Sequence, residues 1–197
     1  MNYTVRKLDQ EAVGSIYQSY MTRDFPSSEL KPLSHIIRSM EQGYGFTMGI
    51  YKETELMGYA VFIVAGGYAL LDYFAVVKEY RGKGVGHEAF DLLTTYFEEN
   101  FSQIRGIYIE AERIDKARNE EERVVRRRRI AFYQSCGCVL TELESTLFGV
   151  AYSIMYYRLG QTEAPPSLEA VDLIYRIMFK KTHYNSFVKL GVAGGKD

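Results

Sequence analysis

The sequence predicts a mixed α+β domain, in which a mixed sheet of about seven strands is flanked by helices in a three-layer arrangement. Stretches with apolar residues at helical spacing alternate with runs rich in β-branched and aromatic residues. In the middle of the chain a strand, a helix and a second strand follow one another, and such crossover units pair their strands in parallel. The chain has 197 residues, of which 47% are hydrophobic and 25% charged, so it is long enough for one globular domain with a sizeable core.

The N-terminal part is predicted to contain one strand and two helices. Residues 3–8 form the strand, and an apolar stripe predicts a helix over residues 11–21. The sequence FPSS at residues 25–28 then breaks the chain. Apolar residues from Leu33 to Met40 predict a second helix that ends near Gly43.

The middle of the chain is predicted to form an antiparallel meander and then the crossover unit. Three strands cover residues 44–51, 56–64 and 68–77, and short turns join them. The amphipathic helix of the crossover runs from Gly84 to about Asn100. The remaining elements of this part are a strand over residues 104–110, a helix over 120–135, and two late strands over 139–141 and 151–157.

The C-terminal residues 161–197 are predicted to form a helical extension beyond a domain that occupies residues 1–160. Two prolines at 165 and 166 precede Ser167, which can cap a helix whose apolar face includes Val171 and Tyr175. We expect this helix to pack on the domain or on a second copy in a homodimer. The final residues, GVAGGKD, are expected to be a flexible tail.

Composition excludes several classes of function. The 24 basic and 25 acidic residues nearly cancel, so no global charge attracts nucleic acid or a membrane. There is no run of 18 apolar residues and no apolar stretch at the start, so we expect neither a membrane span nor a secretory signal, and a cytoplasmic location. Cys136 and Cys138 are too few for a disulfide scaffold or a zinc site, and the three histidines are scattered, so no metal site is expected.

The stretch RGKGVGHEAFDLLTTYF, from Arg81 to Phe97, places three glycines directly before and inside the start of a helix. The start of a helix leaves backbone N–H groups unpaired, and together with the helix dipole these groups bind anions. Glycines let a bulky anion approach the backbone, and Arg81 and Lys83 add positive charge. The pattern therefore predicts a phosphate or pyrophosphate site, although glycines that merely cap a helix are the simpler alternative.

Two familiar phosphate motifs do not fit this loop. The Walker pattern needs four residues between its first glycine and a Gly-Lys-Ser/Thr sequence, which is missing here. The dinucleotide fingerprint needs a third glycine at position 87, where the chain has His87.

The stretch FAVVKEYRGKGVGHEAFDLLTTYF resembles motif A of the GNAT acyltransferases, the Gcn5-related N-acetyltransferases. That motif is Arg/Gln-x-x-Gly-x-Gly/Ala after a strand, and Arg81, Gly84 and Gly86 match it. RRIAFYQSCG resembles motif B, with the aromatic pair at Phe132-Tyr133 and its glycine at Gly137. The order of elements also agrees, and the resemblance covers residues from about 4 to 157.

The resemblance implies a GNAT-like fold and acetyl-CoA or another acyl-CoA as donor. The pyrophosphate would lie on the amides of the loop, and the pantetheine arm would pair with the preceding strand, in a slot where that strand splays from the next parallel one. The implied donor-binding residues are Phe74, Ala75, Val76, Val77, Arg81, Gly82, Lys83, Gly84, Val85, Gly86 and His87.

The resemblance also implies an N-acyltransferase, most simply one that acetylates a primary amine by direct transfer in a ternary complex. Tyr133 is the candidate acid for the departing thiolate, although a tyrosine after Phe132 in a helix is more often part of the core. Glu110, at the predicted end of its strand, is the candidate base. Glu112 faces the same way if the strand continues, and Asp72 is a weaker candidate.

The acceptor is expected to contact Phe25 and Glu29, in the break between the first helices, and Glu112. A backbone N–H near Val76 could stabilise the oxyanion. The asparagine that many family members place two turns before the aromatic pair is missing, since Asn119 lies fourteen positions before Tyr133.

Two alternative functions remain open at this point. One is a catalytically inactive module that senses acyl-CoA. The other is a nucleic-acid-binding protein that uses the run Arg126-Arg127-Arg128-Arg129; four consecutive helical residues spread around the helix, so a solvated face is the simpler interpretation and no nucleic-acid partner is expected.

Overall fold

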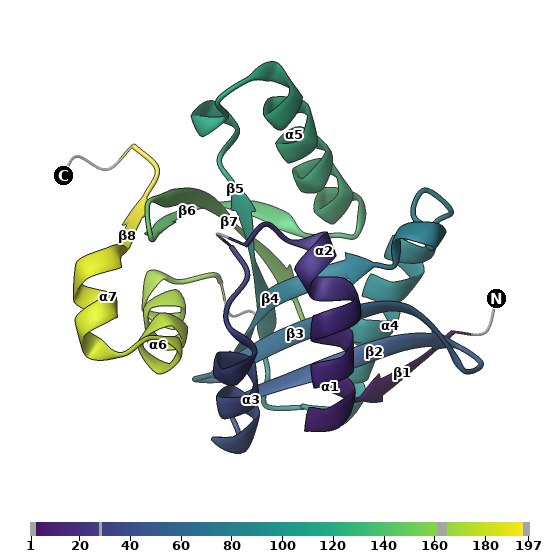
Figure 1. Ribbon diagram of the computed structural model, residues 1–197. Helices are drawn as coiled ribbons and strands as arrows, with labels where there is room; N and C mark the ends of the chain where they lie inside the picture. The colour runs from purple at the N-terminus through teal and green to yellow at the C-terminus, as the bar shows by residue number, and fades with distance from the viewer. Residues whose placement is uncertain (1–2, 28, 161–164, 195–197) are drawn as a thin grey trace. The chain divides into compact units, whose positions relative to one another are not determined.

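The computed structural model describes residues 3–27, 29–160 and 165–194 (Figure 1). The chain folds as two compact units. The first comprises residues 1–64 and 71–101, and the second comprises residues 65–70 and 102–197. Each unit has its own strands and helices.

The first unit combines four strands with helices on two faces of its strands. Its elements are β1 (Tyr3–Lys7), α1 (Gln10–Ile16), η1 (Tyr17–Met21), α2 (Thr22–Asp24), α3 (Leu33–Glu41), β2 (Gly45–Lys52), β3 (Glu55–Ala65), β4 (Tyr68–Val76), η2 (Lys78–Tyr80) and α4 (Val85–Asn100). The strands follow the order β1-β2-β3-β4, and β1 and β3 both pair antiparallel with β2. The last residue of β3 and the first three of β4 fall within residues 65–70, which belong to the second unit. The antiparallel pairing predicted for the first two strands of the meander is therefore present between β2 and β3, and β4 follows β3 in the strand order.

Alternation along β3 divides the core of the first unit into two clusters. Tyr59 and Val61 pack with Val13, Ile16 and Ile36 of α1 and α3, which cross in front of the strands in Figure 1. Phe62 points to the other face, where its ring lies 4.8 Å from that of Phe97 in α4. Successive strand residues point to opposite faces, so one strand supplies both clusters.

The predicted helix over residues 11–21 is interrupted. Asp9 caps α1 by accepting a hydrogen bond from the amide of Ala12, as its position before the helix allows. A π-helical turn, η1, then replaces the regular hydrogen bonding, and the short helix α2 ends at Asp24. Single π turns within helices are frequent at functional sites.

The second unit contains four strands in the order β5-β7-β6-β8. Its elements are β5 (Gly106–Glu112), η3 (Ile114–Lys116), α5 (Glu120–Ser135), β6 (Val139–Leu147), β7 (Val150–Arg158), α6 (Leu168–Met178), α7 (Lys181–Phe187) and β8 (Val188–Val192). The pairings β5–β7, β7–β6 and β6–β8 are all antiparallel. β5 continues beyond its predicted end to Glu112, and the two late strands are longer than predicted.

The C-terminal extension holds more structure than predicted. Ser167 caps α6, and its hydroxyl accepts from the amide of Ala170 at 3.2 Å. After α6 come a second helix, α7, and the strand β8, which lies beside both helices in Figure 1 and pairs with β6. The expected flexible tail is wrong for Gly191 and Val192, which belong to β8; residues 195–197 lie outside the described residues.

The α+β class with a mixed sheet flanked by helices is confirmed, with eight strands instead of about seven because β8 was not predicted. Within the described parts of the chain, every helix is too short or too polar to cross a membrane.

Candidate functional site

The glycine-rich loop of the first unit connects β4 with α4. β4 ends at Val76, and the amide of Val77 donates to the carbonyl of Met57 at 2.9 Å. Gly82 and Gly84 have φ angles of +74° and +81°, a region that residues with a Cβ atom rarely adopt. These two glycines are therefore required by the path of the backbone itself.

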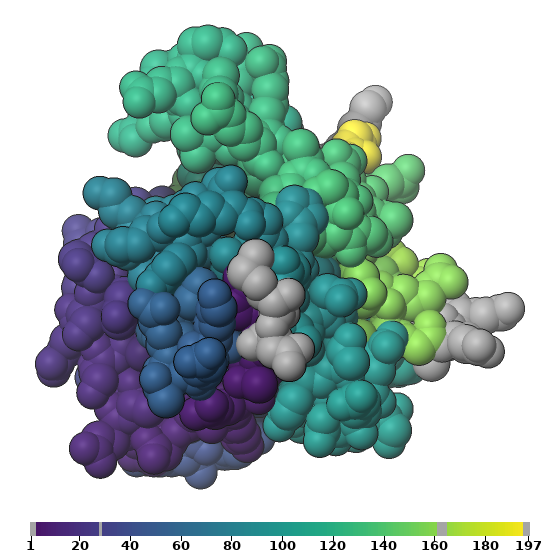
Figure 2. Space-filling model, turned by 90° about the vertical axis from the view of Figure 1, so that its right-hand side faces the viewer, coloured from purple at the N-terminus to yellow at the C-terminus, as the bar shows by residue number. Residues whose placement is uncertain are grey.

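The N-terminus of α4 is open. Gly84 is the N-cap residue and supplies no side-chain hydrogen bond to the first turn. A Cβ atom added at Gly82 or Gly84 would meet no heavy atom within 4 Å, so the space around the loop is free. The loop lies at the surface of the first unit in Figure 2. Helix amides of this kind, without a side-chain cap, are suited to an anion.

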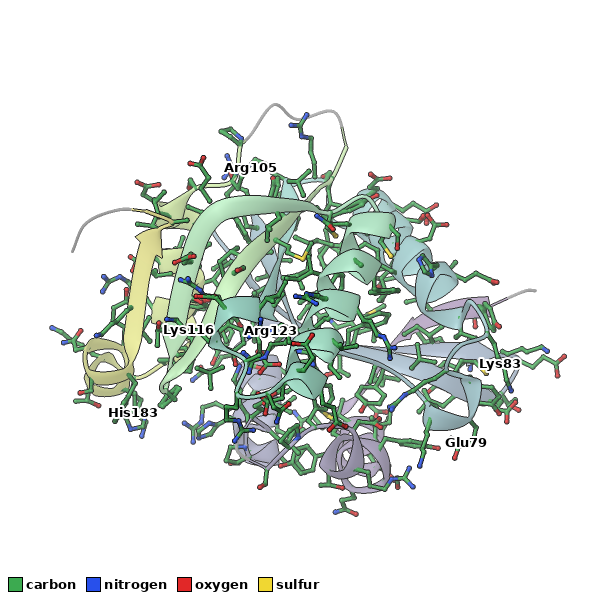
Figure 3. All side chains as sticks on the ribbon, turned by 90° about the horizontal axis from the view of Figure 1, so that it is seen from above. Glu79, Lys83, Arg105, Lys116, Arg123 and His183 are labelled. Carbon is green, nitrogen blue, oxygen red and sulfur yellow. The ribbon has the colours of Figure 1, made fainter. Side chains whose placement is uncertain are left out.

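The two cations of the loop have different partners. Arg81 donates through Nε to the carbonyl of Val76 at 2.8 Å and through its guanidinium to Asp24 at 2.5 Å. Lys83 donates to the carbonyl of Glu79 at 3.0 Å, and both residues lie on the outside of the loop in Figure 3. Arg81 therefore shapes the loop, whereas Lys83 leaves its charge at the exposed surface.

Asp24 also binds a buried tyrosine. Its second oxygen accepts from the hydroxyl of Tyr59 at 2.8 Å. Burial, followed by the hydrogen bond to Asp24, raises the pKa of the Tyr59 phenol well above its usual value. The carboxylate of Asp24 thus joins the end of α2, the strand β3 and the loop.

The end of β4 changes from buried to half-buried. Tyr73 and Val77 are buried, whereas Phe74, Ala75 and Val76 are of intermediate exposure. Gly58 on β3 allows close approach here, because a Cβ atom at Gly58 would lie 2.8 Å from the carbonyl oxygen of Ala75.

The acceptor candidates of the first unit are anchored on β4. The ring of Phe25 packs edge-on against Tyr73, with 4.9 Å between centroids. The hydroxyl of Tyr73 donates to the carbonyl of Glu29 at 2.8 Å and accepts from the amide of Lys31 at 2.9 Å. Both oxygens of Asp72 bind the ammonium of Lys31, at 2.6 and 2.7 Å, so Asp72 serves as an ion-pair partner of this segment.

Glu110 and Glu112 lie in the second unit, two residues apart on one face of β5. The hydroxyl of Tyr175, from α6, donates to a carboxylate oxygen of Glu110. Glu112 instead forms two ion pairs, with Arg126 at 2.9 Å and with Arg129 at 2.7 Å. The two carboxylates therefore have different chemical surroundings.

The arginine run of α5 is divided between two environments. Arg126 and Arg129 are three positions apart on one face and bind Glu112, and the side chain of Arg126 is only 11% exposed. Arg127 and Arg128 are exposed, and Arg127 lies 3.4 Å from Glu120. The interpretation of the run as one solvated face is wrong for Arg126 and Arg129.

Tyr133 lies in the last two turns of α5 and is 8% exposed. Burial raises the pKa of its phenol well above the usual value, and the charge of Arg129 opposes this increase. The hydroxyl therefore carries its proton at neutral pH. Asn119 caps the N-terminus of α5, where its side-chain oxygen accepts a hydrogen bond from the amide of Glu122 at 2.8 Å. This capping role accounts for an asparagine at position 119.

Cys136 and Cys138 are both free cysteines, and Cys138 is buried. Burial raises the pKa of the Cys138 thiol to about 12, so this residue is a poor nucleophile. Among the residues that the structure describes, no three His, Cys, Asp or Glu side chains are grouped in a way that could hold a metal ion.

Sequence reasoning missed Asp24, Ser145 and Tyr175 as site residues. Asp24 lies between the helix predicted over residues 11–21 and the break at residues 25–28, and Tyr175 was predicted on an apolar helix face. Nothing local indicates the partners of either residue. The donor-loop candidates lie in the first unit, and Tyr133, Glu110 and Glu112 in the second.

Comparison with known proteins gives one family. Residues 10–138 match the family described as the acetyltransferase (GNAT) family. No curated protein matches the chain significantly in sequence.

Several solved structures resemble the chain. The ribosomal-protein-S18-alanine N-acetyltransferase from Escherichia coli is 16% identical, with a TM-score of 0.59, covering 84% of this chain and 99% of that one. A putative acetyltransferase from the GNAT family from Bacteroides thetaiotaomicron is 20% identical, with a TM-score of 0.67, covering 87% and 93%. The spermidine N-acetyltransferase from Vibrio cholerae, in complex with CoA and spermine, is 14% identical, with a TM-score of 0.59, covering 79% and 95%. At these identities the likeness shows the fold.

Proposed function

The chain belongs to the GNAT acetyltransferase family, and from this premise we propose that it transfers the acetyl group of acetyl-CoA to a primary amine, by direct attack in a ternary complex. The observation that carries the proposal is the loop before α4. It combines two glycines at positive φ, an uncapped helix N-terminus and open space around both glycines. This combination suits a pyrophosphate, which is the anionic part of CoA.

The donor is proposed to bind in the first unit. The amides from Gly82 to His87 would hold the pyrophosphate, with Lys83 adding charge and Arg81 keeping the loop in shape. The backbone of Phe74, Ala75, Val76 and Val77 would pair with the pantetheine arm, and the intermediate exposure of three of these residues supports this role. Acetyl-CoA supplies an acetyl group activated as a thioester.

Two side chains of the second unit are proposed to move protons. An amine acceptor arrives mostly as an ammonium ion, because its pKa is about 10.4, and must lose a proton before it attacks. Glu110 would accept that proton, and Tyr133 would donate one to the departing sulfur. Glu110 is favoured over Glu112 as the base, since the oxygens of Glu112 are held by Arg126 and Arg129.

The acceptor is proposed to contact Phe25 and Glu29, whose segment Tyr73 fixes on β4. Residues 1–160 are proposed as the transferase domain, with residues 161–197 as an extension of it. A homodimer remains a prediction.

A thermal melt with and without acetyl-CoA, with NAD as the control ligand, tests the donor site. At a hundred times its dissociation constant, a ligand specific for the folded state stabilises it by about 2.7 kcal/mol, or about 5–10 °C for a chain of this size. A rise with acetyl-CoA alone is expected. No rise would mean that the glycines only cap α4.

Release of the CoA thiol from acetyl-CoA then tests transfer. The acceptor panel contains spermidine and a peptide that begins with alanine, because the similar solved structures include enzymes named for these groups. A catalytically inactive acyl-CoA sensor is the second candidate, favoured by the near-complete burial of Tyr133. Such a sensor would bind acetyl-CoA in the melt and release no thiol with any amine.

A further inference from the structure

Glu110 is hydrogen-bonded to a buried tyrosine from the C-terminal extension. The Tyr175 hydroxyl donates to Glu110 and also lies 3.0 Å from the hydroxyl of Ser145. A phenol can donate only one hydrogen bond, and Tyr175 donates its own to Glu110. The hydroxyl of Ser145 can then donate to the phenol oxygen of Tyr175. Tyr175 is fully buried and Ser145 is 3% exposed, so water does not compete for either group.

The structure of α6 fixes the position of Tyr175. The amide of Ser167 donates to the hydroxyl of Tyr108 at 3.0 Å, which ties the start of the helix to β5 two residues from Glu110. Val171 and Ile174 are at most 1% exposed and hold the inner face of the helix against the second unit. The phenol is therefore held by both the cap and the core of α6.

The neighbouring carboxylate on β5, that of Glu112, has different partners. Glu112 is paired with two arginines, one on each of its carboxylate oxygens. Glu110 accepts a hydrogen bond from the Tyr175 phenol, which orients one of its oxygens. Tyr152 of β7 lies opposite Glu112 in the strand pairing.

We propose that Tyr175 is a positioning residue for Glu110, so that α6 belongs to the catalytic apparatus and does more than extend the domain. The inference rests on the proposed function, in which Glu110 takes one proton from the acceptor ammonium. Tyr175 keeps its own proton throughout: burial and the charge of Glu110 raise the pKa of its phenol well above the usual value. Its role is to hold the receiving oxygen and to stabilise the ionised carboxylate before the proton arrives.

The test compares Tyr175→Phe with Tyr108→Phe in the full chain. Both changes remove one buried hydroxyl that links β5 with α6, but only the first touches Glu110. A lost hydrogen bond to a charged group corresponds to roughly a tenfold or larger loss. We therefore expect Tyr175→Phe to lower kcat by about tenfold or more with little change in KM for acetyl-CoA. The acidic limb of the pH–rate profile of Tyr175→Phe should move to higher pH by about one unit.

Tyr108→Phe is expected to lower the melting temperature without moving that limb. A Tyr175→Phe enzyme with the wild-type pH profile, or one that shifts no more than Tyr108→Phe, would overturn the inference. If Tyr175→Phe does not fold, Glu110→Gln provides the test. Wild-type turnover in Glu110→Gln would show that Glu110 is not the base, and Tyr175 would then have no catalytic residue to position.

The proposed function and the role of Tyr175 fail in different ways. If the wild-type chain binds acetyl-CoA but transfers to no amine of the panel, the proposed function is overturned and the inference with it. If transfer occurs and is indifferent to Glu110 and Tyr175, the function stands and the inference is wrong.

Discussion

Arg81, in the loop before α4, donates from its guanidinium to the carboxylate of Asp24, at the end of α2, with 2.5 Å between nitrogen and oxygen. The same arginine donates to the carbonyl of Val76 at 2.8 Å. The proposed donor loop and the segment that begins at Phe25 are therefore connected by one ion pair within the first unit. This pair places Arg81 along the loop backbone.

Replacing Asp24 by asparagine is expected to weaken acetyl-CoA binding several-fold, because Arg81 loses the charge that holds it. The amide can still accept from Tyr59, so the fold should lose only about 1 kcal/mol. A double-mutant cycle with Arg81→Gln, measured by calorimetric titration of acetyl-CoA, checks this. If the two changes act through one pair, the double variant binds about as weakly as either single variant; fully additive losses would show that they act separately.

Gly84 and Gly86 are expected to respond differently to alanine. Gly84 has a φ of +81°, so Gly84→Ala should destabilise the fold by about 1–2 kcal/mol through backbone strain alone. Gly86 lies in the first turn of α4, where alanine is favoured over glycine by roughly 0.5–1 kcal/mol. Urea denaturation measures both changes. Gly86→Ala should keep stability and lose acetyl-CoA affinity, and retained affinity would mean that the ligand does not approach this amide.

The loop was the part of the site that sequence reasoning could predict, because glycines at a helix start have a local cause. Gly82 and Gly84 are required by positive φ angles, and this requirement is visible as a residue type. The contact between Glu110 and Tyr175 joins residues 65 positions apart, and no local pattern specifies it. Asp24 was missed for a related reason, since its partners Tyr59 and Arg81 lie 35 and 57 positions away in the sequence.

The helices and strands were likewise predicted where the signal is local and missed where it depends on distant partners. The bounds of two helices, α4 and α5, were predicted within one residue. β8 was missed because its sequence, VKLGV, contains a glycine and gains its structure only from pairing with β6. The arginine run was misassigned because the partner of Arg126 and Arg129 lies on another element, β5.

Tyr133→Phe is expected to reduce kcat by about a hundredfold while acetyl-CoA still raises the melting temperature. The reason is that the phenol keeps its proton at neutral pH, and phenylalanine has none to donate. Thiol release and the melt, measured on the same preparation, separate chemistry from binding. Unchanged turnover would make Tyr133 a core residue of α5, in keeping with its burial.

Glu112→Gln is expected to act on stability. The change removes the carboxylate that pairs with Arg126 at 2.9 Å and leaves only Glu122, at 3.6 Å, beside this 11% exposed arginine; it should cost about 1–3 kcal/mol. Arg127→Gln, at an exposed position of the same helix, should change the free energy of unfolding by no more than about 0.5 kcal/mol. Urea denaturation of both variants is the measurement, and equal effects would argue against a structural role for the Glu112 pairs.

Stability is expected to fall at alkaline pH because buried tyrosines cannot ionise in the folded chain. Among the phenols whose pKa is raised above 10.0 chiefly by burial are those of Tyr59, Tyr108, Tyr133 and Tyr175. A group whose pKa is higher in the folded chain contributes its full stability below the unfolded pKa, here about 10, and loses it as pH rises toward the folded value. The free energy of unfolding should therefore stay level up to about pH 9 and fall above about pH 10, by up to about 1.4 kcal/mol per pH unit for each tyrosine. Urea denaturation at a series of alkaline pH values measures how steeply the free energy of unfolding falls with pH. Tyr108→Phe should reduce this slope by the contribution of one tyrosine. A slope that this variant leaves unchanged would assign the alkaline loss to other groups.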